Sequence, residues 1–244
     1  MSDPIKQFEE EKKERLAANR HNEALISSAD AFNSASNKAQ YSYNFTWMGR
    51  PIIQYPQDII AMQEIIWQLQ PDLIIETGIA HGGSIIYYAS LLELIGKGEV
   101  LGIDIDIRAH NRDKIENHPM YKRISMIEGS SVSKETLERV KKITEGKQTV
   151  LVLLDSNHTH EHVLAELEMY SPLVTKDSYL VVFDTIVEHL PNYYLPNRPW
   201  KIGDNPFTAV QAFLKNNSDF ISDMNIDNKL LISVAPGGYL KKIK

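Results

Sequence analysis

The stretch DLIIETGIAHGGSIIYYASLLELIG (residues 72–96) decides the fold class. It begins with a short apolar run, continues through a glycine-rich turn (residues 76–84), and ends in a longer apolar segment closed by Gly96. This order predicts a buried strand, a tight turn and a helix. A turn between a strand and a helix is a common ligand-binding position in α/β proteins.

The alternation of strands and helices continues along the rest of the chain. We expect four further strands, at residues 99–106, 123–131, 149–156 and 178–184. We expect helices at residues 56–70, 84–96, 161–173 and 207–216. Residues 220–226 and 229–242 are predicted to form a closing antiparallel pair. Strands that alternate with helices of this length predict an α/β fold with a mostly parallel sheet and helices on both faces.

Length and composition limit the function classes. The chain has 244 residues, a net charge of −6 and no cysteine. The negative charge argues against a general nucleic-acid binder, and the lack of cysteine excludes disulfides and thiolate metal sites. No apolar run approaches the ~20 residues that a membrane span needs, and the charged first residues do not form a signal peptide. We therefore expect a cytoplasmic protein without membrane insertion.

The first residues differ in character from the rest. Residues 1–37 are predicted to be an N-terminal arm, partly helical or flexible, with a loop at residues 27–40. Residues 38–244 are predicted to be a single catalytic domain, because no break divides them. The arm is equally consistent with a frayed tail and with a contact between copies of the chain.

Acidic residues end four of the predicted strands. They are Glu76, Asp104, Asp155 and Asp184. In a parallel sheet the carboxyl ends of the strands share one edge, and ligands bind beyond that edge. We therefore expect these carboxylates to converge on one binding site.

The turn at residues 76–84 indicates the kind of cofactor. Gly78, Gly82 and Gly83 permit sharp turns and close approach of a ligand, and Ser84 opens the helix. The spacing fits neither the dinucleotide nor the triphosphate motif. Glu76 would repel a pyrophosphate but would favour a ligand with an ammonium or sulfonium centre, such as S-adenosylmethionine. The structural alternative is that Glu76 caps local backbone amides and that Asp104 starts a turn.

Two later segments fit the same ligand. Asp104 lies 21 positions beyond Gly83, where an acid can accept hydrogen bonds from ribose hydroxyls. Gly129 and Ser130 follow the third strand and are placed to border the adenine.

Several segments together resemble the cephalosporin hydroxylase-like family, which is related to rhamnosyl and other sugar O-methyltransferases. They include NFTWMGRPIIQYPQDIIAMQEIIWQLQPDLIIETGIAHGGS, GIDIDIRAHN, LLDSNHTHEHVLAELEMYSPLV and DNPFTAVQAFL, in order from about Tyr43 onward. The resemblance implies a Rossmann-like class I methyltransferase fold, with seven strands of which the last is antiparallel. It also implies S-adenosylmethionine as cofactor, usually with a divalent metal such as Mg²⁺, and self-association into a homo-oligomer.

The segment LLDSNHTHEH (residues 153–162) carries the predicted chemistry. By resemblance, Asp155 matches a metal-ligand position and His158 a catalytic base, since an imidazole can accept a proton near neutral pH. Asp184 is the second expected metal ligand. A zinc cluster of His158, His160 and His162 is one alternative, and simple capping of the following helix is another. His160 and His162 are otherwise expected to have no chemical role.

One position departs from the family pattern. The family places two adjacent acids after the fifth strand, whereas this chain has Phe183 before Asp184. A protein that binds an adenosyl ligand without catalysis is therefore an alternative, as is a component of a hydroxylation system. Glu76 argues against a dinucleotide oxidoreductase.

Aromatic residues mark the expected acceptor side. They are Tyr43, Phe45, Trp47, Tyr193, Tyr194 and Trp200. The last three belong to a long proline-rich loop, and such loops often bind substrates. We expect the acceptor to be a sugar, a polysaccharide or a glycosylated small molecule; ordinary packing of the loop is the alternative.

Overall fold

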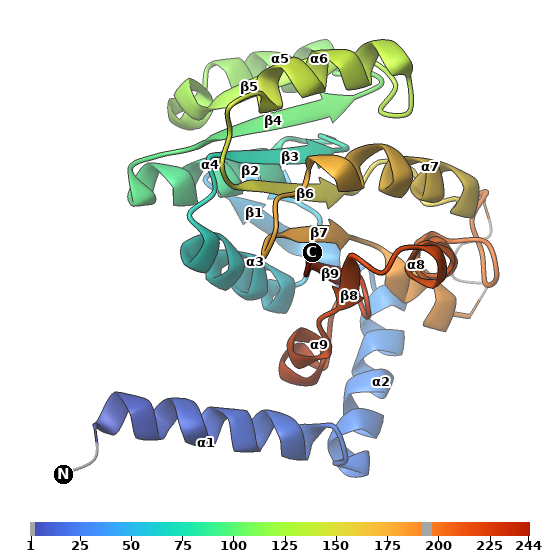
Figure 1. Ribbon diagram of the computed structural model, residues 1–244. Coiled ribbons are helices and arrows are strands. Elements are labelled where there is room, and N and C mark those ends of the chain that lie inside the picture. Colours follow the sequence, from blue (N-terminus) through green and yellow to red (C-terminus); the bar gives the residue numbers. More distant parts are fainter. Residues whose placement is uncertain (1–2, 192–196) are drawn as a thin grey trace.

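The computed structural model describes residues 3–191 and 197–244 (Figure 1). Its centre is a seven-stranded sheet in the order β5-β4-β3-β6-β7-β9-β8. The strands are β3 (Leu73–Thr77), β4 (Glu99–Asp104), β5 (Ile124–Glu128), β6 (Val150–Leu154), β7 (Tyr179–Val182), β8 (Phe220–Ser222) and β9 (Tyr239–Lys242). Strand β9 runs antiparallel to β7 and β8, while the other pairs are parallel. The predicted fold class is confirmed.

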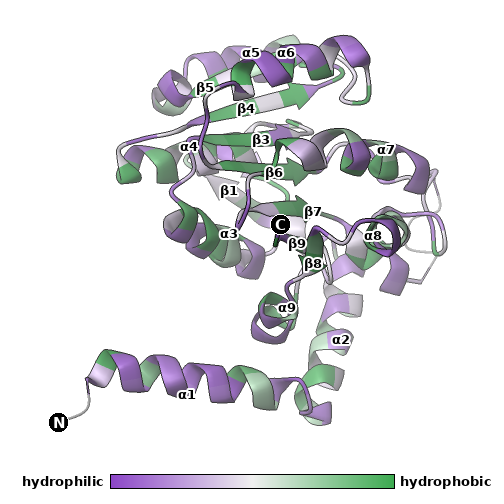
Figure 2. Cartoon of the chain, in the orientation of Figure 1, coloured by the Kyte–Doolittle hydropathy of each residue, from purple (hydrophilic) through white to green (hydrophobic). Residues whose placement is uncertain are grey.

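Two hydrophobic cores flank the sheet, because alternate side chains of each strand face opposite sides. Ile74 of β3 belongs to one core, and its neighbours Leu73 and Ile75 belong to the other. The first core is covered by α3 (Pro56–Leu69), α4 (Gly83–Ile95), α5 (Ala109–Glu116) and α9 (Met224–Leu230). The second is covered by α6 (Lys134–Thr144), α7 (His160–Tyr170) and α8 (Pro206–Asn216). The strands are mainly hydrophobic, and the outer faces of α5 and α6 are hydrophilic (Figure 2).

The loop predicted at residues 27–40 is wrong, because α2 spans Glu23–Lys38. Asn22 caps this helix by accepting a hydrogen bond from the backbone N–H of Leu25. The buried side chains of α2 are Ala29, Asn33 and Ser36, so the packed face is small and polar. Apolar periodicity, the signal from which helices are predicted, is therefore missing.

The predicted closing pair is only partly right. Strands β8 and β9 pair antiparallel, but α9 occupies most of the sequence expected to extend the first strand and begin the second. Helices α5 and α6 were not predicted from the sequence, although both pack on the sheet. In α5 the many charged residues leave few apolar positions to reveal a helical period. Helix α6 does carry such a period in Leu137, Val140 and Ile143, behind the cap of Ser133, so its signal was missed.

The N-terminal arm consists of two helices, α1 (Pro4–Asn19) and α2, that meet at a sharp angle (Figure 1). Helix α1 extends from the body and, among its residues, none is buried. The proposed domain boundary after residue 37 falls in the last turn of α2. Self-association through this arm stays a prediction. None of the helices in the described ranges is long and apolar enough to cross a membrane.

A hairpin of β1 (Phe45–Trp47) and β2 (Arg50–Ile52) connects the arm to the sheet domain. It packs on α4: the indole of Trp47 donates a hydrogen bond to Ser90, and its ring meets Tyr87 edge-on. Phe45 and Trp47, expected on the acceptor side, are instead partly buried against the first core. The alternative of ordinary packing therefore holds for these two aromatics.

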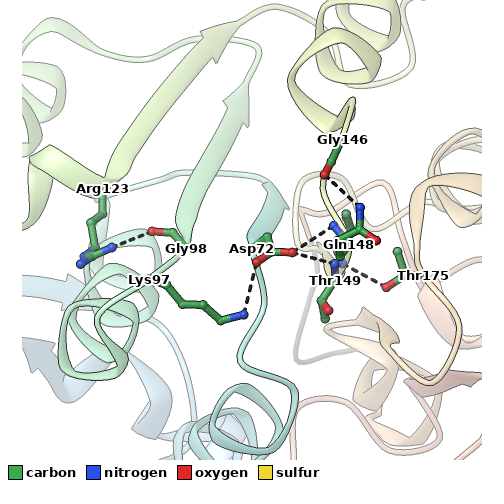
Figure 3. Close-up of polar contacts among 9 residues, drawn as sticks. Asp72, Lys97, Gly98, Arg123, Gly146, Gln148, Thr149 and Thr175 are labelled. Carbon is green, nitrogen blue, oxygen red and sulfur yellow. Dashed lines mark hydrogen bonds and ion pairs between the residues drawn. The ribbon is translucent and has the colours of Figure 1, made fainter.

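The amino ends of the strands are tied together by hydrogen bonds and ion pairs (Figure 3). Asp72 accepts hydrogen bonds from the backbone N–H groups of Gln148 and Thr149 and pairs with Lys97. The nearby cations Lys122, Arg123 and Lys147 are also paired with glutamates. Each of these four cations is thus engaged in an ion pair at this edge.

Candidate active site

Three of the strand-end acids converge at the carboxyl edge of the sheet as predicted, and the fourth lies behind them. Asp104 ends β4, Asp155 follows β6, and Asp184 lies two residues beyond β7. Glu76 lies in β3 and is fully buried. The parallel register of β4, β3, β6 and β7 brings the acids together, because adjacent strands end at the same level.

Asp155, His158 and Asp184 form a compact group. One donor atom from each lies within 4.8 Å of the others. Nε2 of His158 is 3.2 Å from Oδ2 of Asp184, and the His158 ring meets the Trp200 ring edge-on with centroids 4.6 Å apart. Asp155 and His158 lie in the connection between β6 and α7, whereas Asp184 follows β7. The fold therefore brings the three side chains together.

Negative charge accumulates around Asp155. Burial, followed by the nearby charges of Asp184, Glu76 and Glu166, raises the pKa of Asp155 well above its ordinary value. Burial also raises the pKa of Glu76 to about 8, although Ser84 opposes this by donating a hydrogen bond to Oε2 at 2.7 Å. Oε1 of Glu76 has no partner within the described part of the chain. Such a concentration of acids favours a cation.

The glycine turn is held by contacts within the protein. Gly78 has φ +93°, and a Cβ there would lie 2.0 Å from the carbonyl oxygen of Asp155. A Cβ on Gly83 would lie 2.0 Å from the carbonyl oxygen of Pro51, and one on Gly82 would meet Ile115. The glycines therefore let three neighbouring segments pack closely.

Asp104 fixes the conformation of the same turn. Its Oδ2 accepts hydrogen bonds from the backbone N–H groups of Ile79 and Ala80 at 2.8 and 3.2 Å. Its Oδ1 accepts a hydrogen bond from the backbone N–H of Asp106 at 3.1 Å, so the structural alternative for Asp104, that it starts a turn, also fits. A carboxylate offers about four acceptor positions, so this one retains capacity for a ligand.

Three adjacent cavities lie over this edge. The first, of about 160 Å³, is lined by Gly78, Asp104, Gly129, Ser130, Ser131 and His162, among others. The second, of about 190 Å³, is lined by Gly83, Ser84, Asp155, His158 and Asp184, and shares Gly78 and Ser156 with the first. The third, of about 860 Å³, shares Tyr43, His158 and Asp184 with the second. We call them the adenosyl-side, central and acceptor-side cavities.

The predicted cofactor residues are distributed unequally around these cavities. Gly78, Asp104, Gly129 and Ser130 line the adenosyl-side cavity, and Gly83 and Ser84 line the central one. Glu76 and Gly82 line neither; Glu76 lies behind Ser84. Any effect of Glu76 on a bound ligand would therefore be electrostatic.

The three histidines of residues 158–162 do not form a zinc cluster. His158 faces Asp184, whereas Nδ1 of His160 lies 2.8 Å from the hydroxyl of Thr208. Nε2 of His162 lies 3.1 Å from the Ser131 hydroxyl and 3.2 Å from the Ser156 hydroxyl. His162 lies in the first turn of α7, as expected, and it also lines the adenosyl-side cavity.

Two further residues were not predicted from the sequence. Gln54 lines the central cavity, and its amide donates a hydrogen bond to Asp155 at 3.4 Å. Glu166 is fully buried beneath His162. Neither belongs to a recognisable motif, since each gains its partners only through the fold.

Phe183 is packed in the protein interior and supplies no ligand atom to the acidic group. It is 1% exposed and belongs to the first hydrophobic core, where it lies near Tyr88. The position of the missing family acid is therefore filled by apolar packing.

The fold and the site define a Rossmann-like, S-adenosylmethionine-dependent O-methyltransferase, as predicted. Residues 39–243 match the family Rhamnosyl O-methyltransferase/CmcI, and the chain belongs to this family. The predicted resemblance is thereby confirmed.

Individual relatives agree with this membership. The rhamnosyl O-methyltransferase of Mycobacterium tuberculosis is 32% identical over 200 residues, which cover 80% of this chain and 77% of the relative. That of Mycobacterium leprae is 31% identical over 198 residues, covering 80% and 82%. A CmcI structure with Mg and SAM has the same fold at 20% identity, with a TM-score of 0.59 and coverage of 83% and 78%.

Proposed function

We propose that the chain transfers the methyl group of S-adenosylmethionine to a hydroxyl of a sugar, a polysaccharide or a glycosylated small molecule, with His158 as general base. The observation that carries the proposal is the place of His158, which lines both the central and the acceptor-side cavity. A base between a cofactor cavity and an acceptor cavity can reach the proton that must leave the acceptor.

The adenosyl half of the cofactor is assigned to the cavity that Asp104, Gly129 and Ser130 line. There Asp104 would accept hydrogen bonds from the ribose hydroxyls, and the other two residues would border the adenine. The methionyl half is assigned to the central cavity, beside Gly78, Gly83 and Ser84. Because the two cavities share Gly78 and Ser156, one extended ligand can occupy both. Gly82 shapes the turn. Burial raises the pKa of Glu76 behind it to about 8, and a cationic ligand would favour the ionised form of this carboxyl group.

Methyl transfer is a single displacement. The acceptor oxygen bonds to the methyl carbon, the carbon–sulfur bond breaks, and the sulfonium becomes the neutral thioether of S-adenosylhomocysteine. The hydroxyl proton passes to His158. A neutral His158 that donates from Nε2 to Asp184 keeps Nδ1 as the proton acceptor. Alignment of the oxygen with the methyl group supplies much of the rate.

The acidic group fits a divalent cation such as Mg²⁺. Asp155 and Asp184 supply oxygen ligands, and Mg²⁺ is commonly held by one or two carboxylates plus water. The raised pKa of Asp155 supports this fit, because a cation would relieve the repulsion among the buried acids. When bound, the cation would make the acceptor hydroxyl easier to deprotonate.

The acceptor is assigned to the third and largest cavity. Tyr43 and Trp200 line it, and their flat faces suit the apolar faces of sugar rings. The end of α2 also lines it, through Asn37 and Lys38, so the arm contributes to this cavity. Tyr193 and Tyr194, the other aromatics expected here, lie outside the described residues.

The proposal is tested by incubating the protein with S-adenosylmethionine, Mg²⁺ and a panel of glycosides that includes α-L-rhamnosides. Mass spectrometry should find one added methyl group on a sugar hydroxyl, and the matched alcohol without the sugar should stay unmodified. Chelation of the metal should reduce turnover. If S-adenosylhomocysteine binds while no glycoside in the panel is methylated, the result would favour the alternative of a non-catalytic adenosyl-binding protein.

A further inference from the structure

His162 is a cavity residue that methyl transfer does not use. It lies in the first turn of α7 and lines the adenosyl-side cavity together with Gly129, Ser130 and Ser131. Its side chain is about one quarter exposed, at 23%. The imidazole therefore presents part of its surface to the place assigned to the adenine.

Hydrogen bonds to Nε2 determine which nitrogen of the His162 ring carries the proton. The Ser156 hydroxyl donates to Oε1 of Glu166 at 2.7 Å, so its hydrogen is already committed. At the 3.2 Å contact between Ser156 and Nε2 of His162, the serine oxygen must then accept. The Ser131 hydroxyl oxygen, 3.1 Å from the same Nε2, must then accept as well, since one nitrogen cannot be donor to Ser156 and acceptor from Ser131. A neutral His162 consequently carries its hydrogen on Nε2 and keeps a lone pair on Nδ1.

Glu166 reinforces this tautomer. Its side chain is fully buried, and Oε1 lies 3.5 Å from Nε2 of His162. Oε2 has no partner within the described part of the chain. A buried carboxylate with so few donors favours a hydrogen on the adjacent ring nitrogen. Glu166 and Ser156 are thus positioning residues for the imidazole.

Nδ1 of His162 has no hydrogen-bond partner among the residues that the structure describes. We infer that this nitrogen accepts a hydrogen bond from the exocyclic amine of adenine and so makes the site selective for a 6-aminopurine over a 6-oxopurine. A 6-oxopurine would present a carbonyl oxygen to the Nδ1 lone pair, leaving two acceptors opposed. The inference rests on the cofactor placement of the proposed function.

Calorimetry with two ligands tests this selectivity. S-adenosylhomocysteine should bind the parent protein at least roughly tenfold more tightly than S-inosylhomocysteine, as expected when a mismatch leaves a polar group unpaired. His162→Phe keeps a ring but removes Nδ1, so the two affinities should become nearly equal. His160→Phe is the matched control, because His160 instead contacts Thr208, and it should keep the preference.

The position of the hydrogen on the His162 ring is a second test. It is measured in the parent protein and so does not require that the His162→Phe variant folds. In ¹⁵N-labelled protein, NMR should find the hydrogen of His162 on Nε2. Glu166→Gln can donate to Nε2, so it should move the hydrogen to Nδ1 and reduce the preference for the adenosyl ligand.

The outcomes distinguish the role of His162 from the placement of the cofactor. An unchanged affinity ratio in His162→Phe, or a hydrogen on Nδ1 in the parent, would overturn the role of His162 while leaving methyl transfer intact. Failure of the parent to bind either ligand would overturn the cofactor placement as well.

Discussion

Nε2 of His158 lies 3.2 Å from Oδ2 of Asp184, although the two residues follow different strands. This contact links the proposed base to a carboxylate that also belongs to the candidate metal group. Orientation of the base and binding of a cation are thereby coupled through one side chain.

Asp184→Asn tests the orientation of His158. The neutral amide accepts the Nε2 hydrogen more weakly than a carboxylate and can also turn its NH2 group toward the ring. The value of kcat should therefore fall about ten- to a hundredfold, as for other residues that orient catalytic ligands. Affinity for S-adenosylhomocysteine should fall much less than kcat, because Asp184 borders only the cavity assigned to the methionyl half of the cofactor and not the adenosyl-side cavity. Asp177→Asn, at a distant turn, is the control. Full activity in Asp184→Asn would exclude the coupling.

Asp155→Asn tests the cation site. At neutral pH the variant should be more stable than the metal-free parent, because it removes a carboxylate whose pKa is raised by burial and by neighbouring acids. Mg²⁺ at about a hundredfold above its Kd should raise the parent Tm by roughly 5–10 °C and leave the variant Tm unchanged. An equal metal-induced shift in both proteins would place the ion elsewhere.

Glu76 gives stability a predictable pH dependence. Its pKa is raised by burial to about 8, above its ordinary value near 4.5, so the folded state binds a proton more tightly than the unfolded state. The free energy of unfolding should therefore fall as pH rises from about 4.5 to about 8. Glu76→Gln should show a smaller fall over this window, measured by denaturant unfolding. Identical slopes for parent and variant would contradict the burial of an ionisable Glu76.

Gly78→Ala tests the close packing of the glycine turn on Asp155. The added Cβ overlaps the Asp155 carbonyl and also imposes left-handed backbone strain, so unfolding free energy should fall by at least about 2 kcal/mol. Gly49→Ala is a matched control, because Gly49 has a similar φ of +84° but open space around its Cβ position. Equal losses of unfolding free energy in the two variants would mean that only the backbone strain matters and that the overlap of the Cβ with the Asp155 carbonyl is relieved.

Much of the fold could be predicted because its signals are local. The apolar runs of β3 and β6 and the apolar period of α3 are visible in the sequence, and they give the parallel sheet directly. Helix α2 could not be predicted in this way, since its buried face consists of Ala29, Asn33 and Ser36. Its packing depends on the domain that follows.

The candidate site, too, could be predicted only in part from the sequence. The convergence of Asp104, Asp155 and Asp184 follows from the rule that parallel strands end at one edge. The setting of His162 does not, because its partners Ser131 and Glu166 are supplied by a distant loop and by the buried side of α7. Nor could the sequence place Glu76 behind the cavity wall, since that depends on Ser84 covering it.

The role of His158 as general base is tested most directly by single-turnover kinetics. The measurement follows a labelled methyl group from S-adenosylmethionine to a glycoside that the parent methylates. With cofactor saturating, His158→Asn should be slower than the parent by about a hundredfold or more while its cofactor affinity is retained. His160→Asn, two residues away, should react at nearly the parent rate. Transfer by His158→Asn at the parent rate would show that this imidazole does not remove the acceptor proton.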